Sequence, residues 1–117
     1  MPKLISFDID GTLGVGDPPG LVTLDMVRSA RDMGDLIGSC SDRTISFQQQ
    51  LWERHDIPVD FTVLKHKLED VRQQFDAEEY YHIGDTELDS FFAERAGFHF
   101  VWADAAPGHF WGTSASL

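Results

Sequence analysis

The chain has 117 residues, of which 42 % are apolar and 25 % are charged, a balance typical of one globular domain and unlike that of disordered or fibrous proteins. The 20 acidic side chains outnumber the 9 basic ones, which gives a formal net charge of −11 at pH 7. Because nucleic acids and anionic membranes attract positively charged proteins, this charge argues against both partners. The sequence also has no apolar run of the ~18 residues that span a membrane and no segment that resembles a secretory leader.

Short apolar runs alternate with helically spaced apolar residues along the chain. In chain order, the pattern predicts a strand at 4–9, a loop rich in Gly and Pro at 11–20, a helix over 21–33, a strand at 36–40, a helix over 45–55, a strand at 61–64, a short helix over 68–75, a strand at 80–83, a helix over 88–96 and a strand at 98–102. The apolar positions expected to define the last helix are Leu88, Phe91, Phe92 and Ala96.

Strands that alternate with helices form βαβ units. We therefore expect one α/β domain over residues 1–117, built as a doubly wound, mostly parallel five-stranded sheet with helices on both faces. Residues 104–117 form a C-terminal tail without clear periodicity. In such open sheets, ligands bind at the carboxyl ends of the strands. The residues that follow each strand are therefore the candidates for chemistry.

Polar side chains follow four of the five predicted strands. Each has an ordinary structural explanation by itself: Asp10 with Gly11 is a common turn pair, Ser41 can cap a helix, and a single lysine is usually a solvated charge. Their convergence on one edge of the sheet is more informative. The residues are Asp8, Asp10 and Thr12 after the first strand, Ser41 and Arg43 after the second, Lys65 after the third, and Asp85 and Asp89 after the fourth.

The acidic residues among them favour a metal site. Asp8 lies in an apolar run, where an unpaired carboxylate is costly. If the strand stays extended, Asp8 and Asp10 point to the same side, and Asp85 lies near them. A hard divalent cation relieves such repulsion, and Mg²⁺ is commonly bound by one or two carboxylates together with phosphate oxygens. A hydroxyl group and a lysine on the opposite side would suit that phosphate.

Four motifs occur in order on these elements: Asp8-Ile9-Asp10-Gly11-Thr12-Leu13, then Ser41-Asp42-Arg43, then Lys65, then Gly84-Asp85-Thr86-Glu87-Leu88-Asp89. Together they resemble the motifs of the haloacid dehalogenase-like superfamily of phosphatases and phosphotransferases, over residues 4 to about 102. The resemblance implies a Mg²⁺-dependent phosphatase that hydrolyses a phosphate monoester through an aspartyl-phosphate. Its substrate would be a phosphorylated small molecule or another accessible phosphate ester.

The resemblance also implies a role for each residue. Asp8 would be the nucleophile, and Asp10 would protonate the leaving group and then deprotonate the attacking water. Ser41 and Lys65 would bind the phosphoryl oxygens. Mg²⁺ would be held by Asp8, the main-chain carbonyl of Asp10, Asp85 and Asp89. Thr12 would orient Asp10, and Arg43 would contact the substrate.

Two positions have alternatives in the sequence. Ser39 also lies near the end of the second strand and competes with Ser41, which matches the family's pattern of a small residue followed by x-Arg. Lys67 competes with Lys65, which directly follows its strand. Two positions are expected to have no catalytic role: Cys40, as a small buried apolar residue, and His82, as a core residue or one behind the site. Because a single cysteine cannot form a disulfide within the chain, Cys40 also favours a location in the reducing cytoplasm.

The family's usual cap domain has no room here, because the two gaps between motifs hold only a loop and one helix, and one helix and a strand. Two hypotheses follow from the missing cap. Either the site is open and accepts a bulky phosphate ester, or a second copy of the chain in a homo-oligomer supplies the lid. Within the chain, the nearest thing to a lid is the loop 14–20, whose glycines would permit movement. The aromatic residues Trp102, Phe110 and Trp111 either pack back onto the fold or form a subunit interface.

Two other classes of function compete with the phosphatase hypothesis. A signalling receiver module is also a doubly wound domain with an acidic Mg²⁺ site, but its acceptor aspartate follows the third strand, where this chain has Lys65. The other alternative is a phosphatase-like fold that acts as a phosphate-binding or interaction module without catalysis.

Overall fold

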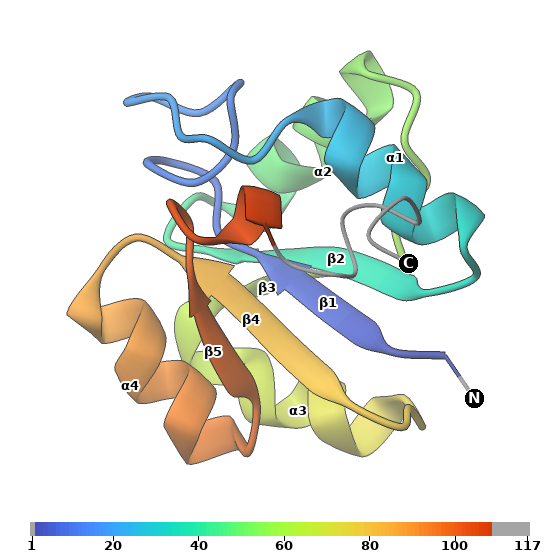
Figure 1. Cartoon of the computed structure of the whole chain (residues 1–117), viewed down its shortest axis with the longest axis vertical. Coiled ribbons are helices and arrows are strands. Elements are labelled where there is room, and N and C mark those ends of the chain that lie inside the picture. Colours follow the sequence, from blue (N-terminus) through green and yellow to red (C-terminus); the bar gives the residue numbers. More distant parts are fainter. Residues whose placement is uncertain (1, 109–117) are drawn as a thin grey trace.

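The computed structural model describes residues 2–108, which fold into a three-layer α/β structure (Figure 1). The five strands are all parallel and lie in the order β3-β2-β1-β4-β5, which confirms the predicted doubly wound sheet. The strands are β1 (Leu4–Phe7), β2 (Leu36–Ser41), β3 (Phe61–Leu64), β4 (Tyr80–Gly84) and β5 (His99–Trp102). The helices are α1 (Leu24–Asp32), α2 (Ile45–Arg54), α3 (Leu68–Gln74) and α4 (Glu87–Ala96), with short 3₁₀ turns η1 (Lys65–Lys67) and η2 (Ala106–Gly108).

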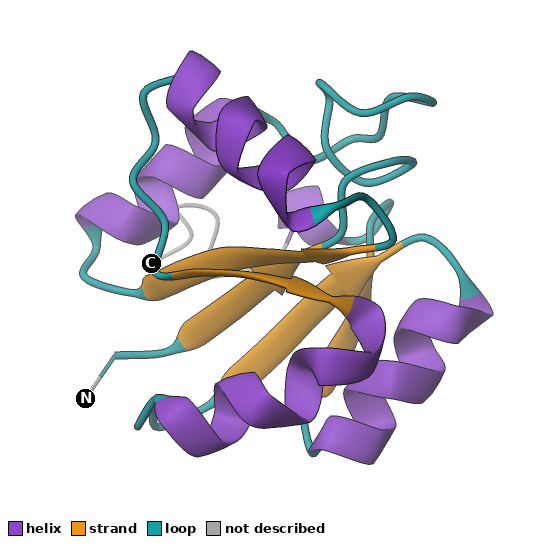
Figure 2. Cartoon of the chain, turned by 180° about the vertical axis from the view of Figure 1, so that it is seen from behind, coloured by secondary structure: helices purple, strands orange, loops and turns teal. Residues whose placement is uncertain are grey.

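The helices cover both faces of the sheet, with α1 and α2 on one face and α3 and α4 on the other (Figure 2). Successive residues of β1 alternate between two cores. Ile5 and Phe7 belong to the core under α1 and α2, and Leu4 belongs to the core under α3 and α4. Because both faces are covered, the central strands are buried almost throughout. Their polar residues include Ser6 and His82, which are fully buried and lie opposite each other in the β1–β4 register.

The strand order defines where a ligand can bind. From β1 the chain moves outward to β2 and β3, then crosses back to β4 and continues to β5 on the other side. The loops that follow β1 and β4 therefore diverge, which opens a crevice between them at the carboxyl edge. A receiver module has the order 2-1-3-4-5 instead, so the observed order argues against that hypothesis. No additional domain covers this edge within residues 2–108.

The first strand is shorter than the sequence pattern predicts. It ends at Phe7, because the chain turns at once: the amides of Thr12 and Leu13 both donate to the carbonyl of Ile9, at 3.1 and 2.9 Å. The amide of Asp8 still donates to Ile83 of β4 at 2.9 Å, which ties the start of the turn to the sheet. Asp8 consequently lies at the end of the strand and Asp10 lies on the turn, so the two do not share one side of an extended strand.

Two helices differ from their predicted patterns. Helix α1 begins at Leu24, after Thr23 caps its first turn by accepting from the Met26 amide at 3.2 Å, so Leu21 lies outside the helix and is 59 % exposed. In α4, Leu88 and Phe91 are 48 % and 56 % exposed, although the sequence pattern placed them on the buried face. The buried positions of α4 are Asp89, Ala93 and Ala96.

The loop 14–20, called the flap below, is fastened to the turn that carries Asp10. Two of its glycines allow close packing: a Cβ atom on Gly16 would lie 2.3 Å from the Ile9 carbonyl oxygen, and one on Gly20 would lie 2.3 Å from that of Thr12. The amide of Gly20 also donates to Leu13 at 2.9 Å.

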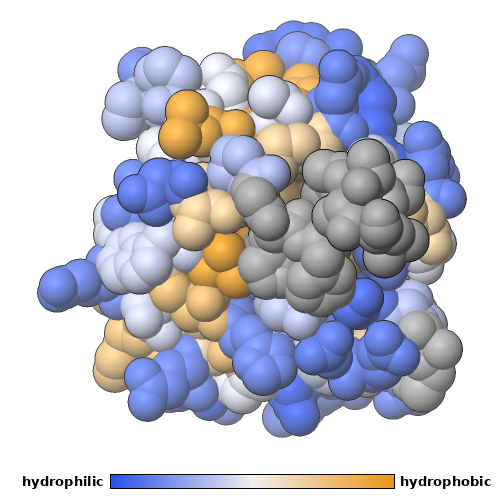
Figure 3. Space-filling model, viewed as in Figure 1, coloured by the Kyte–Doolittle hydropathy of each residue, from blue (hydrophilic) through white to orange (hydrophobic). Residues whose placement is uncertain are grey.

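The surface seen in Figure 3 is largely hydrophilic, with apolar side chains gathered in a few places. Trp102, at the end of β5, packs edge-on against Phe100 with ring centroids 4.8 Å apart, yet 43 % of the residue is exposed. Phe110 and Trp111 lie outside the described residues. None of the helices in the described part of the chain is both long and apolar enough to span a membrane.

Candidate active site

Three carboxylates come together at the crevice between β1 and β4. One oxygen from each of Asp8, Asp85 and Asp89 lies within 4.8 Å of the others. Asp8 and Asp89 are buried and Asp85 is exposed. Asp8 follows β1, Asp85 follows β4, and Asp89 lies in the first turn of α4. Of the four predicted metal-binding residues, these three meet through their side chains, whereas the carboxylate of Asp10 is not part of the cluster.

Lys65 is the cation of this cluster. Its Nζ atom lies 3.2 Å from Asp89 Oδ1, 3.5 Å from Asp42 Oδ2 and 3.9 Å from Asp8 Oδ1, and its side chain is only 8 % exposed. Burial lowers the pKa of Lys65, but the three carboxylates outweigh burial and raise it overall, so the ammonium stays charged. Lys67, the alternative in the sequence, instead pairs with Asp70 at 3.9 Å on the surface.

Asp8 and Asp89 respond differently to the same surroundings. Burial, together with the negative charge of Asp89, raises the pKa of Asp8 to about 8 despite the nearby Lys65. Burial also raises the pKa of Asp89, but the hydrogen bond and charge of His82, with help from Lys65, outweigh it and lower this pKa to about 2. The same surroundings therefore favour the protonated form of Asp8 and the ionised form of Asp89.

Asp89 is fixed from two sides. Its Oδ1 lies 3.0 Å from Nε2 of His82, whose Nδ1 lies 2.9 Å from the hydroxyl of Ser6. Its Oδ2 accepts from the hydroxyl of Thr86 at 2.8 Å and from the Thr86 amide at 3.2 Å, and Thr86 in turn caps α4. This confirms that His82 lies buried behind the site. Ser6 is not among the predicted site residues, although a serine within an apolar strand is a sign of a buried hydrogen bond such as this one to His82.

The carboxylate of Asp10 is turned toward the flap and Arg43. Arg43 donates to Asp10 from Nε at 2.7 Å and from a terminal nitrogen at 3.3 Å, and the amide of Asp17 donates to it at 2.9 Å. Burial raises the pKa of Asp10, but these donors outweigh it and lower the pKa overall. Thr12, expected to orient Asp10, instead donates its hydroxyl to Oδ2 of Asp8 at 3.4 Å.

The two candidate serines of β2 have different surroundings. Ser41 lines the cavity beside Asp8, and its hydroxyl accepts from the Arg43 amide at 3.0 Å. Ser39 is fully buried against α2, where it donates to Gln48 at 2.6 Å and accepts from the Trp52 indole at 3.0 Å. Ser41 is therefore the serine that is placed to meet a ligand.

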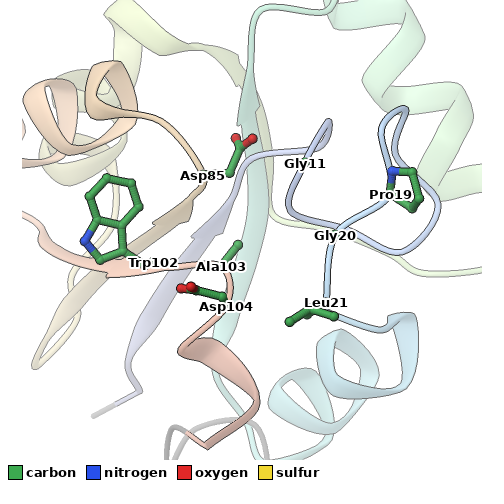
Figure 4. Close-up of a pocket in the computed structure, with 8 residues that line it drawn as sticks. All are labelled: Gly11, Pro19, Gly20, Leu21, Asp85, Trp102, Ala103 and Asp104. Atoms are coloured by element: carbon green, nitrogen blue, oxygen red, sulfur yellow. The ribbon is translucent and has the colours of Figure 1, made fainter.

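Two cavities open at this edge of the sheet. The smaller, of about 200 Å³, holds Asp8, Lys65 and the other predicted catalytic side chains. The larger, of about 520 Å³, lies beside it, and Asp85 lines both. Figure 4 shows the larger cavity between the flap side, with Pro19, Gly20 and Leu21, and the segment that follows β5, with Asp104.

The carboxylate cluster fits a hard divalent cation. Its three donors are oxygens from separate elements, they lie within 4.8 Å, and two of them are buried. Burial and then the charge of Asp89 raise the pKa of Asp8 to about 8, so Lys65 does not offset both. Mg²⁺ takes oxygen ligands and is usually bound by one or two carboxylates together with waters and substrate phosphates. These residues therefore suit the metal that the sequence motifs imply.

Cys40 has no part in this site. It is fully buried in the core under α3 and α4, and burial raises the pKa of its thiol, so the sulfur stays neutral. This agrees with its predicted role as a small apolar residue.

A comparison with known protein-family models finds none that matches this chain, and a comparison with curated protein sequences finds no match either.

Proposed function

We propose that this chain is a Mg²⁺-dependent phosphatase that hydrolyses a phosphate monoester through an aspartyl-phosphate on Asp8. The proposal agrees with the resemblance of its motifs to the haloacid dehalogenase-like superfamily. One observation supports it most: Asp8 shares a cavity of about 200 Å³ with the ammonium of Lys65 and the hydroxyl of Ser41, and two further carboxylates lie within 4.8 Å. A nucleophile, donors for phosphoryl oxygens and ligands for a cation thus occupy one small space.

In the first half-reaction, an oxygen of Asp8 attacks phosphorus while the bond to the leaving oxygen breaks. Lys65 and Ser41 bind the non-bridging phosphoryl oxygens and stabilise their charge in the transition state. Attack needs ionised Asp8, and its neighbours Lys65 and Thr12 favour that form. When bound to Asp8, Asp85 and Asp89, Mg²⁺ supplies further positive charge to the phosphoryl group and to Asp8.

In the second half-reaction, water attacks phosphorus and Asp8 leaves as a carboxylate, so that inorganic phosphate is released. Asp10 accepts the proton of this water. Its lowered pKa suits that role, because the side chain is already ionised near neutral pH. To donate a proton to the leaving oxygen in the first half-reaction, Asp10 must first loosen its contact with Arg43.

A phosphate-binding module without turnover is the second candidate. The observation that favours it is the close pairing of Asp10 with Arg43 at 2.7 Å, which occupies the proposed acid and base. In that case the cavity would bind phosphate and Mg²⁺, and no ester would be cleaved.

The decisive experiment measures hydrolysis of a panel of aryl and alkyl phosphates with Mg²⁺ and with EDTA. We expect Mg²⁺-dependent turnover that Asp8→Asn abolishes. The matched control is Asp76→Asn, which removes the same charge from an exposed position just before β4, at the opposite edge of the sheet. Acid quenching during turnover of a ³²P-labelled ester should trap label on wild-type protein, and hydroxylamine should release it.

Each result separates the candidates. No turnover of any ester, with phosphate binding retained, would favour the module without catalysis. Full activity in Asp8→Asn would remove Asp8 as nucleophile.

A further inference from the structure

The larger cavity of about 520 Å³ adjoins the smaller one that holds Asp8 and Lys65, which is called the catalytic cavity below. Asp85 lines both cavities, and consecutive prolines of the flap divide them, with Pro18 on the catalytic side and Pro19 on the other. The carboxylate of Asp85 lies over Gly11: a Cβ atom there would be 1.9 Å from its Oδ2. The bare backbone of Gly11 therefore makes room for Asp85 at the boundary. A group attached to a phosphate in the small cavity can extend past Asp85 into the larger one.

The walls of this cavity combine apolar surface with negative charge. Trp102 and Leu21 line it and are 43 % and 59 % exposed, so both offer apolar surface to a ligand. The edge-on contact of Trp102 with Phe100, at 4.8 Å, leaves part of the indole open. The charged side chains that line the cavity in the described structure are Asp85 and Asp104, and no basic side chain lines it.

Two basic groups at the smaller cavity next to it already have acidic partners. Lys65 contacts Asp8 and Asp89, and Arg43 is paired with Asp10. A second phosphate or a carboxylate on the leaving group would therefore meet uncompensated negative charge, in a chain whose net charge is −11. An ammonium would instead be attracted by Asp104 and by the face of an aromatic ring.

We propose that this cavity is the leaving-group subsite of the enzyme and that it selects phosphate monoesters of aromatic alcohols that carry an ammonium group. This inference rests on the proposed phosphatase function. The ring packs on Trp102 and Leu21, and the ammonium faces Asp104. The volume of about 520 Å³ is within the range of small-molecule sites. Overall, water replaces the alcohol on phosphorus, and the products are the free amino alcohol and inorganic phosphate.

Three matched aryl phosphates test the proposal: O-phosphotyramine, 4-ethylphenyl phosphate and 4-(2-carboxyethyl)phenyl phosphate. They share a ring and a two-carbon arm and differ in the charge at its end. We expect kcat/KM to fall from the amine to the neutral ester to the carboxylate, by about 10-fold or more over the series and mainly through KM. High salt should reduce the difference between the charged esters.

Variants assign the effect to this cavity. Asp104→Asn should reduce the preference for the amine over the carboxylate severalfold, with little change for the neutral ester. Trp102→Ala should raise KM for all three esters. Asp76→Asn, which makes the same change of charge at the opposite edge of the sheet, should leave the preference as in wild type.

A binding measurement keeps the subsite separate from catalysis. Tyramine is titrated into the metal-free protein, and the indole N–H resonance of Trp102 is followed by NMR, with Trp102→Phe to assign it. A saturable shift with tyramine, and none with 3-(4-hydroxyphenyl)propionate, supports the subsite. Equal kcat/KM for the three esters would overturn the subsite and leave the phosphatase intact. Hydrolysis of none of them, nor of any other ester, would overturn the phosphatase, and with it the subsite as proposed.

Discussion

His82 places its Nε2 atom 3.0 Å from Oδ1 of Asp89, and the two side chains are 1 % and 0 % exposed. Because an ionised carboxylate can only accept, the imidazole donates this hydrogen bond. His82 is held in turn by Ser6, at 2.9 Å from its Nδ1. This buried chain, which runs from β1 through β4 to α4, fixes the direction in which Asp89 presents its second oxygen.

Replacing His82 by Phe should weaken Mg²⁺ binding. We expect the dissociation constant to rise roughly 10- to 100-fold, as is typical when a residue that orients a metal ligand is removed. The unfolding temperature should also fall, because a buried carboxylate loses a donor. Calorimetric titration with Mg²⁺ measures the first effect and thermal unfolding the second.

His82→Gln provides the matched control, because an amide can still donate to Asp89, and it should retain more of the affinity than His82→Phe. Ser6→Ala should have a smaller effect than His82→Phe, since it removes only the outer hydrogen bond. Unchanged Mg²⁺ affinity in folded His82→Phe would mean that Asp89 is not a ligand or does not need His82.

The raised pKa of Asp8 predicts how stability depends on pH in the metal-free protein. This pKa is about 8 in the folded protein, against an ordinary value of 3.8, so the folded state binds more protons than the unfolded chain between these values. Asp8 therefore contributes fully to the free energy of unfolding below pH 3.8, and this contribution is lost as the pH rises through 8. The loss is at most about 1.4 kcal/mol per pH unit.

Asp8→Asn should lack this loss, because the amide does not titrate. Urea unfolding in EDTA between pH 5 and pH 8 should show the variant gaining stability over wild type as the pH rises. Asp76→Asn should follow the wild-type slope. Parallel slopes for Asp8→Asn and wild type would show that Asp8 is ionised throughout this range.

Mg²⁺ binding should release a proton, because the cation must displace the one that Asp8 holds below pH 8. We expect the apparent affinity to rise with pH from 6 to 8, by up to about 10-fold per unit for a single released proton. Calorimetry in buffers of different ionisation enthalpy counts the released protons. Asp8→Asn should bind more weakly and release none, whereas pH-independent binding by the wild type would place the cation away from Asp8.

Arg43→Gln should alter the pH dependence of turnover. Burial raises the pKa of Asp10, while the hydrogen bonds from Arg43 and Asp17 lower it, so loss of the guanidinium should raise this pKa. If Asp10 is the base of the second half-reaction, the acidic limb of the kcat profile moves to higher pH. Arg43→Lys keeps the positive charge and should shift the limb less. An acidic limb that does not move would assign it to another group.

The fold was predictable because its signals are local. Apolar runs bounded by Gly, Asp and Pro predicted every strand, and the alternation with helices predicted the parallel sheet that the structure confirms. Strand ends were less predictable. The sequence continues apolar through Ile9, but the hydrogen bonds of Thr12 and Leu13 to the Ile9 carbonyl end the strand at Phe7.

Helix α4 shows why the spacing of apolar residues alone predicts the wrong buried face of a helix. Leu88 and Phe91 have helical spacing, yet the helix turns Ala93 and Ala96 toward the sheet and buries Asp89 instead. A carboxylate is tolerated there because His82, Thr86 and Lys65 surround it. Two of these partners lie on other elements, so periodicity within the helix carried no sign of them.

The candidate site was predicted better as a set than as individual contacts. The position of each residue after a parallel strand predicts that Asp8, Lys65, Asp85 and Asp89 lie at one edge of the sheet, and the structure places them there. Which carboxylate faces which cation depends on side-chain direction. The pairing of Asp10 with Arg43, across 33 positions in the sequence, had no local signal.

The hydrogen bond from the Asp17 amide to the Asp10 carboxylate, at 2.9 Å, makes the flap part of the surroundings of the proposed acid. Any displacement of Asp17 away from the turn removes a donor from Asp10 and thereby raises its affinity for a proton. In the proposed phosphatase, a substrate that moves the flap aside therefore also raises the pKa of Asp10, through this one main-chain amide. The seven residues of the flap then link substrate entry to proton transfer.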